Sequence, residues 1–95
     1  MIQSSSVVVL SGDVRYRVIN DEAVLVRQRA GEVLALNEVG TRVVELLDGR
    51  RQVGEIVDAL VDELEVERST LEKDILEFLQ ELADSGVVGS ADDGQ

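Results

Sequence analysis

Leu36-Asn37-Glu38-Val39-Gly40, followed by Glu45-Leu46-Leu47-Asp48-Gly49, marks the point where this chain changes from strand to helix. Asn37 is a residue type that caps helix N-termini, and Gly49 is suited to end the helix. The preceding residues, 33–36, form a strand with no polar face. Such a strand needs cover on both sides, and at a sheet edge it offers unpaired backbone groups to another chain. The combination indicates capture of a peptide and not catalysis.

Upstream of this point the pattern is that of strands. Residues 14–18 alternate between apolar and polar residues, and residues 23–29 are expected to form the next strand. Asn20-Asp21 predicts a turn between these runs, and Ala30-Gly31 predicts a tight hairpin before residues 32–36. Residues 7–10 are apolar enough for a short strand or belong to a frayed arm. We therefore expect a three-stranded antiparallel meander whose last strand is an edge unless the N-terminal segment covers it.

Downstream of this point the apolar spacing is helical and predicts helices over residues 38–48, 53–64 and 70–85. Ser69 and Glu72 have the spacing of a capping box at the start of the third helix. Val87-Val88 is expected to return to the core. Three strands followed by three helices predict an α+β domain. Two tandem helices beside a small sheet also describe a winged-helix-like arrangement.

The third helix has an apolar surface that spans roughly 160° when Leu76 and Ala83 are included. One flank of this helix is acidic, with Asp74, Glu77 and Glu81. A helix packed against two neighbours explains this width. The alternative is a helix whose spare apolar margin forms one wall of a groove.

The composition excludes several functions. Net charge is −11, and residues 1–51 balance seven Arg against seven acidic residues. Residues 52–95 carry two basic and thirteen acidic residues, and so hold the whole charge. DNA would be repelled by this surface. The same acidity serves either solubility or attraction of a basic partner segment.

Catalytic and metal sites lack their usual parts. The chain has no His and no Cys, so neither a triad nor a zinc site can be built from standard residues. It also has no Gly-rich phosphate-binding motif. The sequence predicts no enzyme, no cofactor and no metal.

The order of several short motifs resembles the PqqD-like proteins, which are the recognition elements of ribosomally made, post-translationally modified peptide (RiPP) pathways. The resemblance runs from about Val14 to Val88. Family members often have a large aromatic residue at the position of Val44 and Ile or Val at that of Arg42. The matching motifs are Leu36-Asn37 with Gly40, residues 45–49, Val53 with Glu55-Ile56, Asp74-Ile75, Phe78-Leu79 with Leu82, and Gly86-Val87-Val88.

The resemblance implies a winged-helix-like fold that binds the leader of a precursor peptide. The leader would add as a strand to the last strand of the sheet and lie against the third helix, which is β-augmentation. The residues expected to contact it are Glu32, Val33, Leu34, Ala35, Leu36, Leu71, Asp74, Ile75, Phe78, Leu79 and Leu82.

The partners implied by the resemblance are a precursor leader peptide and a leader peptidase or other modifying enzyme of the same pathway. A stand-alone element with Arg50-Arg51 after its first helix is most similar to those of lasso-peptide pathways, and the pyrroloquinoline quinone pathway is the sister possibility. The alternative is an acidic winged-helix interaction or regulatory module that binds no leader peptide.

The expected organisation is a single domain. Residues 1–12 form an arm or short strand, residues 13–88 the recognition domain, and residues 89–95 a disordered tail. No signal peptide or membrane span is recognisable, so we expect a cytoplasmic protein without nucleic-acid or membrane partners.

Overall fold

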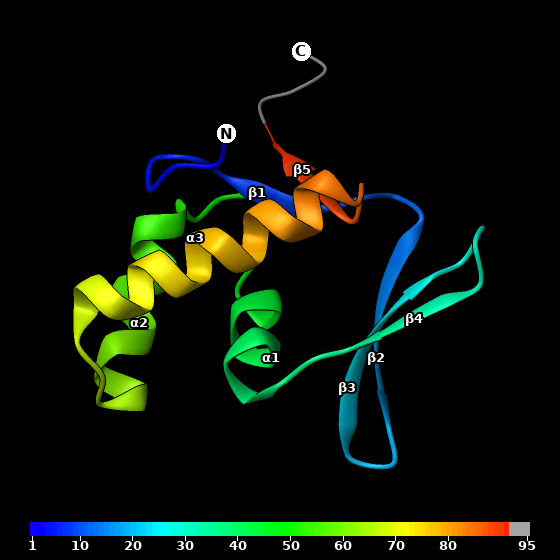
Figure 1. Ribbon diagram of the computed structural model, residues 1–95, viewed down its shortest axis with the longest axis horizontal. Coiled ribbons are helices and arrows are strands. Elements are labelled where there is room, and N and C mark those ends of the chain that lie inside the picture. Colours follow the sequence, from blue (N-terminus) through cyan, green and yellow to red (C-terminus); the bar gives the residue numbers. More distant parts are fainter. Residues whose placement is uncertain (92–95) are drawn as a thin grey trace.

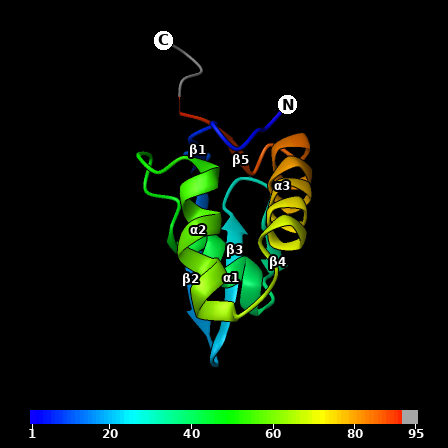
Figure 2. The ribbon, with the colours of Figure 1, turned by 90° about the vertical axis from the view of Figure 1, so that its left-hand side faces the viewer.

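The computed structural model describes residues 1–91. The helices gather on one side of the molecule, and the β2–β3 hairpin projects from the other (Figure 1). Figure 2 looks from the helical side and shows α2 and α3 with the sheet of β2, β3 and β4 behind them, and α2 and α3 pack against each other. The elements in chain order are β1 (Val8–Leu10), β2 (Val14–Ile19), β3 (Glu22–Arg27), β4 (Glu32–Ala35), α1 (Glu38–Glu45), α2 (Val53–Leu64), α3 (Arg68–Asp84) and β5 (Val88–Ser90).

Strands β2, β3 and β4 form an antiparallel meander in chain order. Asn20 and Asp21 turn the first hairpin with φ of 52° and 67°. Positive φ at both central residues fits the right-handed twist of the flanking strands, and Asn and Asp tolerate it better than most residues. Gly31, at φ 68°, lies in the second turn. The sheet followed by three helices confirms the predicted α+β fold.

The predicted bounds hold for α2 and for the start of α1, and they differ at the end of α1 and at α3. Asn37 caps α1 as expected, because its Oδ1 accepts a 2.7 Å hydrogen bond from the Gly40 N–H. Helix α1 ends at Glu45, three residues before the predicted end at Asp48. The capping box lies at α2, where Gln52 and Glu55 bond to each other's backbone.

The predicted capping box at Ser69 is wrong. Helix α3 begins at Arg68, and its N-cap Glu67 makes no side-chain cap. The guanidinium of Arg68 lies 2.9 Å from Asp58 and 3.3 Å from Glu72, and Glu72 also accepts a hydrogen bond from Ser4. The carboxylate of Glu72 therefore bonds to side chains and does not cap the backbone.

One hydrophobic core joins all three helices to both sheets. Val44 is among its buried residues, so the core accommodates valine at the position where members of the resembled family often have a large aromatic residue. The core residues are Val8, Val14, Leu25, Val43, Val44, Val53, Ile56, Val57, Leu60, Leu71, Ile75, Leu79, Val87 and Val88.

The N-terminal segment packs on the helices. Strand β1 pairs with β5, so it leaves β4 uncovered. Ahead of β1, the N–H groups of Val53 and Gly54 donate to the carbonyls of Ser6 and Ser4, at 2.9 and 2.8 Å. The Ile2 N–H donates to Gln80 on α3 at 2.9 Å. These bonds hold the arm against α2 and α3.

The end of the described chain differs from the expectation of a tail starting at Gly89. Gly89 and Ser90 belong to β5 and pair with Val9 and Val8. The remaining tail residues, 92–95, lie outside the described part of the chain. Within residues 1–91 no helix has the length and apolar character needed to cross a membrane.

Candidate peptide-binding site

Strand β4 has one free edge. It is the terminal strand of its sheet and pairs only with β3 among the described elements. The Leu36 N–H donates to the Ala23 carbonyl at 3.0 Å, so the backbone groups of Leu36 point towards β3. Because the direction alternates along an antiparallel strand, the N–H and C=O groups of Val33 and Ala35 point away from β3. These groups are available to an added strand.

The side chains of this strand divide between two environments. Leu34 and Leu36 are partly buried and pack against the core. Val33 and Ala35 lie on the opposite face and are exposed, with Val33 at 58%. The expected apolar strand is thus covered on one face and open on the other face and along one edge.

An apolar hollow opens where this strand leads into α1. Its volume is about 240 Å³, and Asn37, at the end of the β4–α1 connection, forms part of its wall. Gly40 faces Phe78 across it, so the first turn of α1 comes close to α3. We call it the α1–α3 hollow; it is lined by Asn37, Val39, Gly40, Val43, Asp74, Ile75 and Phe78.

The predicted contact residues of α3 fall into two groups. Leu71, Ile75 and Leu79 are buried in the core, and of these only Ile75 lines the hollow. Phe78 and Leu82 are partly exposed, and Asp74 is exposed at the rim. The structure therefore brings Asp74, Ile75 and Phe78 together and places Leu71 and Leu79 in the interior.

The wide apolar surface of α3 serves two neighbours. Leu76, at one margin, shares a surface hollow with Met1, Ile2 and Gln80, where the N-terminal arm crosses the helix. Phe78, at the other margin, lines the α1–α3 hollow. One margin is thus occupied by the arm of the same chain, and the other is open.

Arg27 ties the sheet to the end of α3. Its guanidinium donates to the Ser85 carbonyl, just past the last turn of α3, and bonds to Glu32 at 3.0 Å. A cation at a helix C-terminus is favourable, because the last carbonyls carry partial negative charge. This contact fixes the start of β4 relative to α3.

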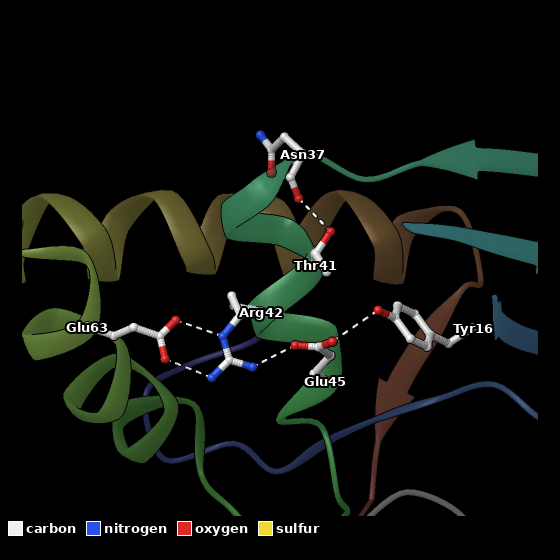
Figure 3. A network of polar contacts seen from close by, with 6 residues as sticks. All are labelled: Tyr16, Asn37, Thr41, Arg42, Glu45 and Glu63. Atoms are coloured by element: carbon white, nitrogen blue, oxygen red, sulfur yellow. Dashed lines mark hydrogen bonds and ion pairs between the residues drawn. The ribbon is translucent and has the colours of Figure 1, made fainter. Parts of the chain in front are cut away.

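Arg42 organises a polar network on another face of α1 (Figure 3). Its guanidinium lies 2.6 Å from Glu45 and 2.7 Å from Glu63, and Tyr16 donates to Glu45 at 3.1 Å. The hydrogen bond from Arg42 is the main cause that lowers the pKa of both Glu45 and Glu63. Desolvation, followed by the bond to Glu45, raises the pKa of Tyr16.

Sequence reasoning gave no role to Gly40 or Arg42. The signal for Gly40 was a glycine inside the first turn of a helix. Because glycine destabilises helices, its presence there indicates a position where close packing leaves no room for a side chain. The departure from the aliphatic family pattern at Arg42 was visible, but its partner Glu63 lies 21 residues away. The described residues contain no cluster of His, Cys, Asp or Glu suited to a metal ion.

An open strand edge beside an apolar hollow is the arrangement by which β-augmentation domains bind extended peptides. The family described as coenzyme PQQ synthesis protein D (PqqD) matches residues 22–88. This chain belongs to the PqqD family, which confirms the resemblance inferred from its motifs.

Similar proteins include the PqqA binding protein of Rhodopseudomonas palustris (strain TIE-1), 37% identical over 59 residues. That match covers 62% of this chain and 58% of the relative, so the chain spans less than two thirds of that protein's length. The PqqA binding protein of Gluconobacter oxydans (strain 621H) is 41% identical over 46 residues, or 48% of each chain.

Two solved complexes share the fold over most of the chain. TbiB1 in complex with the TbiA(beta) leader peptide is 34% identical, with a TM-score of 0.76 and coverage of 92% of this chain and 96% of that one. Lasso peptide synthetase B1 complexed with the leader peptide is 28% identical, with a TM-score of 0.79 and coverage of 88% and 99%.

Proposed function

We propose that this protein binds the leader segment of a ribosomally made precursor peptide by strand addition to β4. The observation that carries the proposal is the free edge of β4 leading into the α1–α3 hollow. Similarity to two proteins solved with leader peptides, over nearly their whole lengths, supports it.

The geometry suggests how each part contributes. Backbone pairing with Val33 and Ala35 sets the register of the leader, and a side chain entering the hollow beside Phe78 provides specificity. Leu82, partly exposed further along α3, extends the apolar wall. Asp74 at the rim suits a basic residue of the leader.

An affinity in the low-micromolar range or tighter is expected. Each of two or three buried anchors contributes about 1.5–3 kcal/mol. Ordering a disordered leader costs about 2–5 kcal/mol of this. The anchors alone therefore leave at most about 7 kcal/mol, so low-micromolar binding also needs the backbone hydrogen bonds to β4, at about 0.5–1.5 kcal/mol each.

We infer a non-catalytic role in which the protein delivers the bound leader to a leader peptidase or other modifying enzyme. The pathway is most similar to those that make lasso peptides. The coverage of the lasso synthetase complex supports this assignment over the PqqA-binding relatives, which match a shorter segment. Raising the local concentration of the precursor near the enzyme is sufficient for such a role.

Titration of a fluorescently labelled precursor leader peptide tests the proposal. Saturable binding is expected, while a scrambled leader of the same composition does not bind. Absence of saturation at concentrations on the order of 100 µM, about 5.5 kcal/mol in free energy, would overturn it and favour the interaction module without leader binding.

A further inference from the structure

A second hollow, of about 410 Å³, lies between the β2–β3 hairpin and α1. Its apolar part is formed by Tyr16, Val18, Ala23 and Leu36, and Val18 is 61% exposed. Asn37 is the only residue that lines both this hollow and the α1–α3 hollow among the described residues. We call it the acidic hollow, because its remaining lining residues are Asp21, Glu22, Glu38, Thr41, Arg42, Glu45 and Glu63.

The charge of this lining is strongly negative. Five carboxylates and one guanidinium give a local charge of −4. Arg42 is shared between Glu45 and Glu63, as Figure 3 shows. The other three carboxylates, on Asp21, Glu22 and Glu38, form no ion pair within residues 1–91.

This acidity is not a consequence of the overall charge. Residues 1–51 have no net charge, yet four of the five carboxylates in the lining come from this half of the chain. Their neighbours in the fold are Tyr16 and Val18, so carboxylates and exposed apolar atoms occur together. This combination suits cationic side chains, which have an apolar stem and a charged head group.

We propose that the acidic hollow docks a basic segment of a partner protein. Its Lys or Arg head groups would meet Glu22 and Glu38, and their aliphatic stems would pack on Tyr16 and Val18. Opposite charges across an interface steer encounter and select the partner. Since α1 separates this hollow from the α1–α3 hollow, partner and leader can be bound together. The proposal thus extends the delivery role without requiring leader binding.

The test uses a defined probe, the peptide acetyl-Leu-Arg-Leu-Arg-Leu-amide, titrated into ¹⁵N-labelled protein without leader. Amide shifts are expected to cluster at Tyr16, Val18, Glu22 and Glu38. The analogue with citrulline in place of arginine, which is neutral, should bind at least about threefold more weakly, since each surface ion pair contributes modestly.

A matched pair of variants separates specific docking from general acidity. The double variant Glu22→Gln with Glu38→Gln is expected to bind the probe at least about threefold more weakly. Glu65→Gln with Asp84→Asn removes the same net charge from the ends of α2 and α3, and should change the affinity by less than about twofold. The heteronuclear spectrum of each variant verifies its fold.

Three results would overturn the proposal. They are shifts spread along α2 and α3, equal weakening by both variant pairs, or no binding of the probe at millimolar concentration. Because the assay contains no leader, none of these results bears on leader binding. Conversely, a failed leader titration would leave the docking result unchanged.

Discussion

A Cβ atom on Gly40 would lie 3.2 Å from Phe78 Cζ and 3.0 Å from Asn37 Oδ1. Glycine at this position therefore lets α1 approach α3 while the Asn37 cap stays in place. The close approach also leaves the Phe78 ring free to form a wall of the α1–α3 hollow.

Gly40→Ala is expected to weaken leader binding with little loss of stability. The new methyl group must displace Phe78 from its place in the α1–α3 hollow. If leader binding requires Phe78 at that place, the strain of returning it costs about 0.5–1.5 kcal/mol, or about twofold to tenfold in affinity. Alanine gains up to about 1 kcal/mol in helix propensity, which offsets the effect on folding. Leader titration and urea unfolding measure the two effects separately. Unchanged affinity would mean that the leader does not contact Phe78.

Ala35→Pro is expected to abolish strand addition, since the outward N–H of Ala35 is lost. Proline is tolerated on an edge strand where the N–H does not pair within the sheet. Ala35→Thr keeps the N–H and serves as the control. In the unmodified protein, leader should slow amide exchange at Val33 and Ala35 and leave Leu34, which faces β3, nearly unchanged. Equal protection of all three amides would contradict the assigned direction.

Asp74→Asn is expected to weaken a leader with basic residues by up to about fivefold, the upper range for an exposed pair. It should also flatten the dependence of the dissociation constant on salt, because exposed charges are screened within about 3 Å at 1 M. Glu77→Gln is the matched control, since Glu77 lines the hollow beside the N-terminal arm. Equal effects of the two variants would assign the attraction to overall charge.

Leu79→Ala and Leu82→Ala should separate the core from the binding site on α3. Leu79 is fully buried, so its truncation should cost about 2–5 kcal/mol of unfolding free energy. Leu82 is partly exposed. Its truncation should therefore lower the unfolding free energy less than that of Leu79 does, and should weaken leader binding more. Chemical denaturation paired with leader titration provides both values. If Leu82→Ala lowered the unfolding free energy more than Leu79→Ala does, Leu82 would belong to the core and Leu79 to the binding site.

Arg42→Met is expected to destabilise the fold at neutral pH and to matter less in acid. Arg42 lowers the pKa of Glu45 and Glu63 below the ordinary value of about 4.3. A group with a lowered folded-state pKa adds stability above its unfolded pKa and loses it as pH falls through the folded value. Urea unfolding at pH 7 and pH 3 measures the difference.

Arg50→Met is the control for this pH dependence, because the Arg50 side chain forms no ion pair in the part of the chain described. A destabilisation by Arg42→Met that is constant with pH would instead reflect lost packing. Carboxyl-carbon NMR titration of Glu45 and Glu63 would locate the effect.

The sequence was sufficient to predict the meander, the three helices and the edge strand, since each depends on local periodicity and turn residues. It could not separate Leu79 from Phe78, because a helical repeat identifies an apolar face but not the neighbours that cover it. Likewise, the spacing of Ser69 and Glu72 was compatible with a cap. The competing partners of Glu72, Arg68 and Ser4, come together only in the folded chain.

The pairing of β1 with β5 brings residues 8–10 and 88–90 side by side. Both strands lie at the top of Figure 1, far from the turn of the β2–β3 hairpin at the bottom. A domain with neighbouring ends can be inserted into a loop of a host protein or circularly permuted with little strain. Joining another polypeptide beside β1 and β5 would therefore be expected to leave the edge of β4, in the other sheet, unobstructed.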